Sequence, residues 1–355
     1  MRYTRFGFVV LLAVMLAASA LAQAPAAKPH VVILATGGTI AGVAASETAA
    51  GYASGAVAVD TLIAAVPQMK DLAIVTGEQI ASIGSQDMND EVWVRLAART
   101  NELLASKDVD GVVITHGTDT LEETSYFLHL VVKSEKPVVM TGSMRPSTAM
   151  SADGPLNIYN AVAIAADPQS RGRGVLVAVN DDIHSAHDIV KRHTTDVETF
   201  TSNEPGLVGV TLFGKQEFYR SPAKPHTART DFTITAGQKL PRVDIIYAHA
   251  NMSPDLIDAA AANGAKGLVI AGVGDGNMTA PALEAVKRAV AKGVVVVRSS
   301  RTGGGIIRRN IEVDDDKVGT VASMDLNPGK ARVLLQLALT KTSNAKQIQE
   351  YFNRY

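Results

Sequence analysis

The sequence contains no cysteine, which excludes disulfide bonds, thiol catalysis and cysteine-ligated metal sites. An excess of either charge is also absent, because 34 basic residues stand against 35 acidic ones, for a formal net charge of -1. The sequence therefore offers no electrostatic basis for binding nucleic acid. With 355 residues, 46% of them hydrophobic, the chain can bury a large core without disulfides, and its length predicts two domains.

Two kinds of ligand-binding motif are missing as well. No HExxH segment or similar spacing of His and carboxylates occurs, so we expect no bound metal. The chain also has neither a GxGxxG segment nor a Walker lysine, which leaves a nucleotide enzyme as a weakly supported alternative.

The first 22 residues are typical of a secretory signal peptide. Arg2 and Arg5 precede an apolar run at 8–22, which ends in the small-x-small sequence Ala20-Leu21-Ala22. This run has 15 residues, fewer than the roughly 20 that span a bilayer, so a membrane anchor is the less favoured alternative. We therefore predict cleavage near Ala22, a periplasmic or secreted protein, and no membrane association after cleavage.

Short runs rich in β-branched residues alternate with amphipathic helical patterns from His30 onward. This alternation indicates βαβ units around a mostly parallel, flavodoxin-like sheet in an N-terminal α/β domain at 30–220. The expected strands are 31–36, 111–117, 137–143 and 174–181, and the expected helices are 90–106, 120–132 and 155–166.

The alternation stops and then restarts. The stretch from 215 to 241 holds three prolines and little apolar periodicity, which predicts a hairpin followed by a linker at 221–241. A smaller C-terminal α/β domain with a parallel sheet is expected at 242–355. Its expected strands are 243–250, 267–273 and 294–300, and its expected helices are 254–263, 281–292, 328–341 and 345–355. Pro328 is typical of a first helical turn and Asn327 of an N-cap.

Residues 41–58 fit neither pattern. They are almost wholly Ala, Gly, Ser, Thr and Val around a single aromatic residue, Tyr52. Because small residues provide no packing anchor, we expect this segment to be mobile. A long loop beside a ligand-binding edge is often a lid, although an ordinary surface loop is the alternative.

The first expected strand ends in Gly37-Gly38, followed by Thr39. Glycines at a strand end let a ligand approach the backbone and expose N–H groups to an anion. Thr39 on its own is more typical of a turn cap than of a catalytic residue.

A second expected strand ends in a polar segment, His116-Gly117-Thr118-Asp119, before a helix. Thr118 or Asp119 could cap that helix. In open α/β sheets, however, the carboxyl ends of the strands gather at the ligand-binding edge, so Thr39 and Thr118 should lie on the same edge. Two hydroxyls, a carboxylate and free N–H groups are the components of acyl transfer. We interpret His116 as a packed, hydrogen-bonded histidine rather than a general base.

Two further sites are candidates. Ser85 and Gln86 carry donors and acceptors suited to an α-carboxylate, or could cap the helix that follows. Lys191 would ordinarily be a solvated surface charge. If the fold draws it to Thr118, its amine could lower the cost of deprotonating that hydroxyl.

Five segments together resemble the bacterial type II, secreted L-asparaginases. They are ILATGGTIAG (33–42), IGSQDMND (83–90), ITHGTDTLEET (114–124), MRPSTAMSADGP (144–155) and NPGKARVLLQLALT (327–340). The segments occur in order, and the resemblance covers the mature chain from about His30 to Tyr355. The segments at 247–255 and 302–316 resemble the family less closely.

The resemblance implies a catalytic role for five residues. Thr39 matches the nucleophile that attacks the side-chain amide carbon and forms an acyl-enzyme. Tyr52 matches the tyrosine that supports and activates this hydroxyl. Thr118, Asp119 and Lys191 match the second catalytic group, in which Lys191 and Thr118 form a proton relay.

The resemblance also implies the binding residues. Ser85, Gln86 and Asp119 match residues that hold the α-carboxylate and α-ammonium of the substrate. The backbone N–H groups of Gly38 and Thr118 match the oxyanion hole.

Two C-terminal residues, Asn251 and Glu312, match residues that reach a neighbouring subunit's site, where Glu312 helps to hold the ammonium. The resemblance therefore implies a homotetramer with shared active sites. It implies no metal and no organic cofactor.

The implied reaction is hydrolysis of L-asparagine to L-aspartate and ammonia, with minor L-glutaminase activity. The Ser-Gln-Asp sequence at 85–87 is typical of asparagine-preferring members. A broad-specificity glutaminase-asparaginase stays an alternative, because one methylene is a small difference for a pocket to recognise. A nonenzymatic periplasmic amino-acid binding protein, which also has two α/β lobes, is a further alternative.

Overall fold

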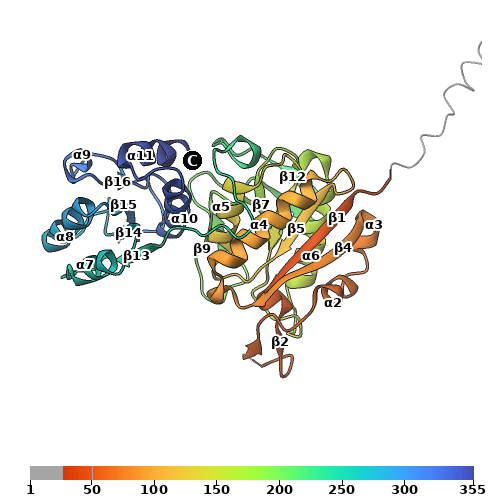
Figure 1. Cartoon of the computed structure of the whole chain (residues 1–355). Coiled ribbons are helices and arrows are strands. Elements are labelled where there is room, and N and C mark those ends of the chain that lie inside the picture. Colours follow the sequence, from red (N-terminus) through yellow and green to blue (C-terminus); the bar gives the residue numbers. More distant parts are fainter. Residues whose placement is uncertain (1–26, 50) are drawn as a thin grey trace, which may run out of the picture.

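The computed structural model describes residues 27–49 and 51–355 (Figure 1). The predicted signal peptide at 1–22 lies outside the described residues. In the described part, the chain forms a large and a small α/β domain, each built on its own sheet, as predicted.

The large sheet has the strand order β12-β11-β8-β7-β6-β5-β1-β4. The five strands from β7 to β4 are parallel, whereas β8, β11 and β12 join the sheet antiparallel. The strands are β1 (His30–Gly37), β4 (Ile74–Ile83), β5 (Gly111–Thr115), β6 (Val138–Thr141), β7 (Val175–Val179), β8 (Asp182–Ser185), β11 (Gly209–Leu212) and β12 (Lys215–Phe218).

Helices cover both faces of this sheet, because alternate side chains of a strand point to opposite faces. Val32 and Leu34 of β1 belong to a core cluster with α4 and α5, and Val31 and Ile33 to a second cluster with α2 and α6. The helices of this domain are α2 (Val59–Ala64), α3 (Met69–Leu72), α4 (Asp90–Ala105), α5 (Leu121–Val131) and α6 (Gly154–Ala166), with 3-10 turns η1 (Thr39–Ala41), η2 (Ser85–Asp87), η3 (Pro168–Ser170) and η4 (Thr227–Arg229).

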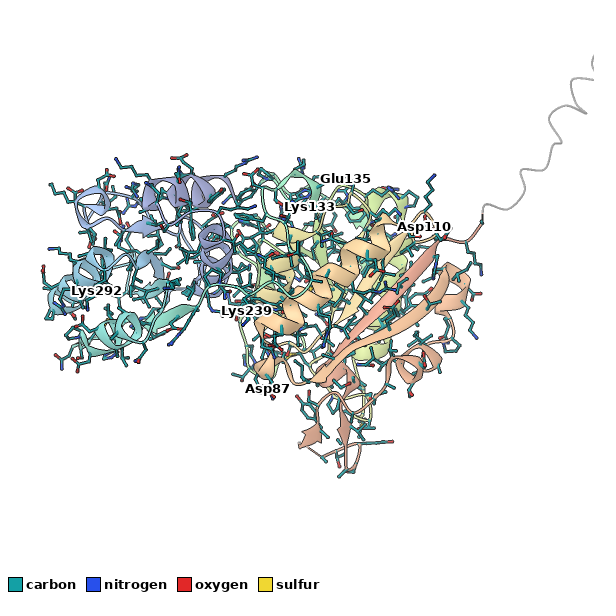
Figure 2. All side chains as sticks on the ribbon, in the orientation of Figure 1. Asp87, Asp110, Lys133, Glu135, Lys239 and Lys292 are labelled. Carbon is teal, nitrogen blue, oxygen red and sulfur yellow. The ribbon has the colours of Figure 1, made fainter. Side chains whose placement is uncertain are left out.

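The small sheet is parallel, with the order β13-β14-β15-β16. Its strands are β13 (Val243–Tyr247), β14 (Gly267–Gly272), β15 (Val295–Ser300) and β16 (Val321–Ala322). Its helices are α7 (Asp255–Ala262), α8 (Ala280–Ala291), α9 (Asp315–Val318), α10 (Pro328–Leu339) and α11 (Ala345–Arg354). The segment between the two sheets carries Lys239, which Figure 2 labels at the junction of the domains.

Helix α10 joins the two domains, because it packs against α5 of the large domain and against β13, β14 and β15 of the small one (Figure 1). The predicted N-cap is confirmed: the Asn327 side chain accepts a hydrogen bond from the N–H of Lys330 at 3.0 Å, and Pro328 occupies the first turn.

The predicted strands and helices of both domains are confirmed to within a few residues, but two predictions need correction. No strand was predicted at 74–83, where the structure has β4. This strand lies at the sheet edge and is partly exposed, so it lacks the near-continuous apolar run of a central strand. The hairpin predicted from 215 onward begins earlier, because β11 and β12 pair over 209–218.

The segment predicted to be a lid contains a short antiparallel hairpin of β2 (Val43–Ala44) and β3 (Tyr52–Ala53). Its mobility stays a prediction. A second small hairpin joins β9 (Ile189–Lys191) to β10 (Phe200–Ser202). Among the described residues, no helix has both the length and the apolar character needed to cross a bilayer.

A buried ion pair stabilises the C-terminal domain. The Arg298 guanidinium donates to both Asp315 oxygens at 2.7 and 2.8 Å, and the exposed fractions of the two side chains are 1% and 0%. Burial acts to raise the pKa of Asp315, but hydrogen bonds from Arg298, Thr320 and the Asn310 N–H bring it below its ordinary value. The carboxylate is therefore charged and fully partnered in the folded state.

We expect Asp315→Ala to destabilise the protein strongly, because it leaves a buried guanidinium without its partner. Such a loss typically costs about 3–5 kcal/mol of unfolding free energy. Urea unfolding checks this against Asp316→Ala, whose more exposed carboxylate pairs with Arg309 and should shift the midpoint little. Equal midpoints for the two variants would contradict the prediction.

Candidate active site

The site begins where two neighbouring parallel strands end. β1 and β5 pair in register up to Ala35 and Thr115, so the residues that follow them leave the sheet side by side. Gly38 has a φ of +80°, and a Cβ added to it would lie 2.3 Å from the Cα of Gly117. Only glycine permits this approach of two backbones. The contact brings the segment that carries Thr39 next to the segment that carries Thr118.

A pocket of about 400 Å³ opens at this edge. It is lined by Thr39, Tyr52, Thr118, Asp119 and Lys191, so the structure brings all five predicted catalytic residues to one cavity. These residues come from η1, β3, the loop before α5, and β9. Segments up to 152 positions apart in the sequence, Thr39 and Lys191, therefore meet only in the folded chain.

The Thr39 hydroxyl is hydrogen-bonded to the hydroxyl of Tyr52 at 2.7 Å. Thr39 is 7% exposed, whereas Tyr52 is 43% exposed. Tyr52 therefore reaches from the β2–β3 hairpin over a nearly buried hydroxyl and can exchange a proton with it.

A second hydrogen-bonded group lies across the pocket. The Lys191 Nζ donates to Thr118 Oγ1 at 2.9 Å and to Asp119 Oδ1 at 2.7 Å. The Lys191 side chain is only 16% exposed, because it points into the site rather than into solvent. This arrangement connects an amine directly to a hydroxyl and a carboxylate in the cavity.

Ser85 and Gln86 are not among the residues that line the pocket. Ser85 is 5% exposed; its Oγ accepts the N–H of Asp119 at 3.1 Å, and its carbonyl oxygen accepts the hydroxyl of Thr120 at 2.7 Å. The Gln86 side chain lies against Gly84. In this conformation Ser85 therefore fixes the loop that carries Asp119.

The Gly38 N–H, which is a predicted oxyanion donor, already has a hydrogen-bond acceptor in the structure. It donates to the Ile83 carbonyl oxygen at 2.9 Å, because β4 continues alongside the end of β1. It would have to give up this bond to receive an oxyanion. Within residues 27–49 and 51–355, the N–H groups of Thr39 and Thr118 donate to no backbone or side-chain acceptor.

The interpretation of His116 as a packed histidine is confirmed. Its side chain is fully buried, and Nδ1 is 2.6 Å from the Gly117 carbonyl oxygen. Burial lowers the pKa of His116 to about 4, so the ring is neutral near pH 7. The His116 ring therefore supports the polar segment at 116–119, which carries Thr118.

Asn251 and Glu312 do not line this pocket in the described chain. Asn251 follows β13 with a φ of +58°, and Glu312 lies between β15 and α9, where it accepts the side-chain N–H of Asn277. Both are in the small domain, whereas every residue lining the pocket is in the large one.

Several other residues that line the pocket have no role predicted from the sequence. Met144, Arg145 and Pro146 line the pocket from the loop after β6. Asp153 holds this loop by accepting the N–H groups of Met144 at 2.8 Å and Arg145 at 2.9 Å. The sequence could have indicated this loop as part of the site, because it follows a third parallel strand, β6, at the same edge of the sheet. Elsewhere in the described chain, no cluster of three or more His, Asp or Glu side chains is arranged to hold a metal ion.

Comparison with known proteins matches both domains. Residues 30–224 match the family described as "Asparaginase, N-terminal", and residues 242–352 match "Glutaminase/Asparaginase C-terminal domain". The chain is 53% identical to "Probable L-asparaginase periplasmic" of Haemophilus influenzae, over 92% of this chain and 93% of that protein. It is 48% identical to "Glutaminase-asparaginase" of Pseudomonas fluorescens, over 92% and 90%.

A solved structure has the same fold. "Probable Cytoplasmic L-asparaginase" from Campylobacter jejuni superposes with a TM-score of 0.90 at 49% identity, covering 92% of this chain and all of that one.

Proposed function

This chain belongs to the asparaginase family of type II bacterial enzymes and hydrolyses L-asparagine, and we propose that the reaction passes through an acyl-enzyme on Thr39. One observation carries the mechanism. The Thr39–Tyr52 pair and the Lys191–Thr118–Asp119 group face a single cavity, which Thr39 and Thr118 reach from two adjacent strand ends. A nucleophile with a proton acceptor and a separate amine-linked hydroxyl are the groups that amide hydrolysis needs.

In the first half-reaction, Thr39 Oγ1 attacks the side-chain amide carbon. Its proton passes to the Tyr52 oxygen 2.7 Å away as Tyr52 releases its own hydroxyl proton to the substrate nitrogen. The carbonyl π electrons move onto oxygen, which forms a tetrahedral oxyanion. The C–N bond then breaks, and the nitrogen, which has received the proton from Tyr52, departs as ammonia. The product of this step is an ester between Thr39 and the β-carboxyl of aspartate.

In the second half-reaction, water attacks the ester carbon. The relay of Thr118 and Lys191 accepts a proton from the water and returns it to Thr39 Oγ1 as the ester bond breaks. L-aspartate leaves, and the enzyme returns to its starting protonation state. The Thr39–Tyr52 pair thus transfers protons while the ester forms, and the Lys191–Thr118 relay transfers them while the ester is hydrolysed.

For the oxyanion, we assign the N–H groups of Thr39 and Thr118. The hydrogen bond from Gly38 to Ile83 supports this replacement of the donor first expected at Gly38. For the rest of the substrate, Asp119 is positioned to bind the α-ammonium, because 58% of its side chain is exposed at the pocket. Ser85 and Gln86 stay assigned to the α-carboxylate side of the site, at the base of the same loop.

We also assign the protein to a homotetramer in which Asn251 and Glu312 complete a neighbour's site. Exposed apolar side chains on the small domain support a covering partner: Tyr247 is 60% exposed and Leu256 65% exposed. Sedimentation equilibrium of the mature protein distinguishes a tetramer from a monomer, and a monomer with full activity would exclude shared sites.

The location is assigned to the periplasm or the exterior on the basis of the segment at 1–22. The Haemophilus relative is named periplasmic and the Campylobacter protein cytoplasmic, so the names of similar proteins differ on this point. N-terminal sequencing of the protein recovered from cells tests cleavage near Ala22. An intact Met1 would contradict the assignment.

Ammonia release from L-asparagine and L-glutamine tests the function directly. We expect kcat/KM to be higher for L-asparagine, with minor turnover of L-glutamine. Comparable values for the two amides would favour a glutaminase-asparaginase, the name of the Pseudomonas relative. Binding without turnover would favour an amino-acid binding protein.

A further inference from the structure

The strand that carries Lys191 has little support from the sheets. β9 spans only Ile189–Lys191, and in the described chain it pairs with β10 alone, outside the eight-stranded sheet. A three-residue strand with one neighbour does not fix a side chain by its ladder alone. The position of the Lys191 amine must therefore depend on other contacts.

One of these contacts is the carboxylate of Glu122. Its Oε2 accepts the backbone N–H of Lys191 at 2.9 Å. Glu122 lies in the first turn of α5, directly after the loop that carries Thr118 and Asp119. Lys191 is therefore held at two points by one continuous segment, its amine by Thr118 and Asp119 and its backbone by Glu122.

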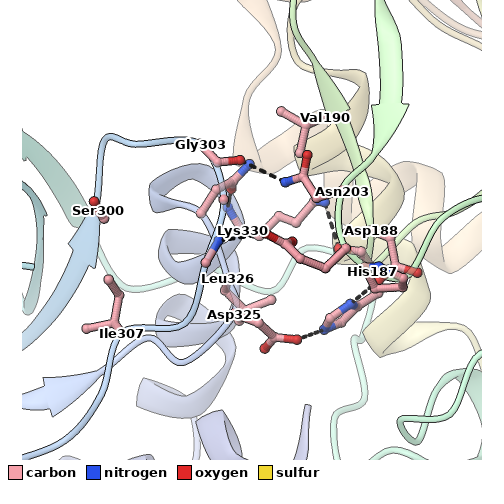
Figure 3. A pocket seen from close by; sticks show the side chains of 15 residues that line it. His187, Asp188, Val190, Asn203, Ser300, Gly303, Ile307, Asp325, Leu326 and Lys330 are labelled. Atoms are coloured by element: carbon pink, nitrogen blue, oxygen red, sulfur yellow. Dashed lines mark hydrogen bonds and ion pairs between the residues drawn. The ribbon is translucent and has the colours of Figure 1, made fainter. Parts of the chain in front are cut away.

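The other Glu122 oxygen contacts the small domain. Oε1 accepts the side-chain N–H of Asn327 at 3.0 Å, and Asn327 caps α10 through the N–H of Lys330. The Lys330 amine, 2% exposed, then donates to the carbonyl oxygens of His187 at 2.7 Å and Ile189 at 2.6 Å. Figure 3 shows Lys330 beside His187 and Asp188 at this junction. The first turn of α10 thus holds the chain on the N-terminal side of Lys191.

The charged groups around the Lys330 amine are consistent with these contacts. Burial lowers the pKa of Lys330, while the carboxylates of Glu122, Asp188 and Asp325 act in the opposite direction. The Lys330 amine is held by two backbone carbonyl oxygens, which supports a fixed arrangement, because a buried amine is tolerated only when it is hydrogen-bonded.

We propose that Glu122 is a positioning residue for Lys191, and that Asn327 and Lys330 of α10 complete the same clamp on β9. This inference rests on the proposed role of Lys191 in the reaction. Glu122 itself does not line the pocket and acts only through the placement of the Lys191 amine.

Glu122→Gln tests the proposal with little change in volume. A glutamine has one carbonyl oxygen and one amide nitrogen, so it cannot accept from both Lys191 and Asn327. We expect kcat to fall by roughly 10- to 100-fold, because displacement of a catalytic group by about 1 Å costs up to that much. KM should change by less than about threefold, since the groups that bind substrate stay in place.

Glu123→Gln is the matched control. Glu123 is the next residue on the same turn, and it also faces α10, with Arg332 at 3.8 Å, but no hydrogen bond joins it to β9 among the described residues. We expect wild-type kcat for this variant. An equal fall in kcat for both variants would assign the effect to domain packing and overturn the proposal.

A double-mutant cycle with Lys191→Met separates positioning from a general structural effect. If Glu122 acts through Lys191, Glu122→Gln should lower kcat in the wild-type background but not further in the Lys191→Met background. Equal losses in both backgrounds would contradict the proposal. Full activity of Lys191→Met would instead refute the role of Lys191 in the proposed function, so the two failures are distinguishable.

Asn327→Ser carries the test if Glu122→Gln is not recovered folded. Serine retains an N-cap for α10 but lacks the amide that donates to Glu122. We expect a several-fold lower kcat at an unchanged melting temperature. Unchanged kcat would overturn the clamp.

Discussion

Replacing Thr39 with alanine is expected to abolish ammonia release while the protein still folds. The change removes the atom that forms the acyl bond, and neither the Tyr52 hydroxyl nor the N–H groups of the site can replace it. Loss of a nucleophile lowers kcat by roughly three orders of magnitude or more in enzymes with similar groups. Among the described residues, the Thr39 hydroxyl is hydrogen-bonded only to Tyr52, so the free energy of unfolding should change little.

Initial-rate measurement of ammonia release, together with a thermal melt, checks this result. Thr39→Ser is the matched variant, because it keeps the hydroxyl and removes only a methyl group. It should retain much more activity than the alanine variant. If Thr39→Ala keeps even a tenth of wild-type turnover, the assignment of roles in this site is wrong.

Thr118→Ala is expected to have the second largest effect. The change removes the hydroxyl that accepts from the Lys191 amine at 2.9 Å and leaves the Thr39–Tyr52 pair untouched. Positioned proton transfer contributes about 10²- to 10⁴-fold to rate, and kcat should fall by that order. Because we assign this relay to hydrolysis of the ester, the acyl-enzyme should accumulate on Thr39.

Intact-protein mass spectrometry after rapid quenching detects such an adduct. Thr118→Ser restores the hydroxyl and should clear the adduct at nearly the wild-type rate. If Thr118→Ala loses turnover but no covalent adduct is detected, Thr118 acts in the first half-reaction instead. Wild-type turnover in this variant would remove the relay from the mechanism.

Much of the fold was predictable because its signals are local. The run Val31–Thr36 is almost wholly apolar and lies in a central parallel strand, and Asn327 with Pro328 marks the start of α10. β4 was missed for the converse reason, since this edge strand has no fully buried residue and mixes Thr, Glu, Gln and Ser with its apolar residues. The hairpin was predicted too late in the chain, because the prolines lie in the linker that follows the hairpin and not in its turn.

The site was predictable as a set of residues but not as a set of contacts. Glycine followed by a hydroxyl at two strand ends identified Thr39 and Thr118 as candidates. No local signal indicated that the Gly38 N–H is occupied by Ile83, or that Ser85 supports Asp119 from behind. These bonds join residues that are 34 or more positions apart, and their existence depends on how the elements pack.

By itself, the sequence determined the alternation of strands and helices, the edge at which the strands end, and the chemical groups available there, because each follows from side-chain periodicity and backbone sterics within a few residues. Only the tertiary structure decided that Gly38 meets Gly117, that Lys191 turns inward to Thr118, and that Glu122 and α10 hold it there. The reason is physical: a hydrogen bond needs two groups within about 3 Å, and for groups far apart in the chain that distance is set by the packing of the whole domain.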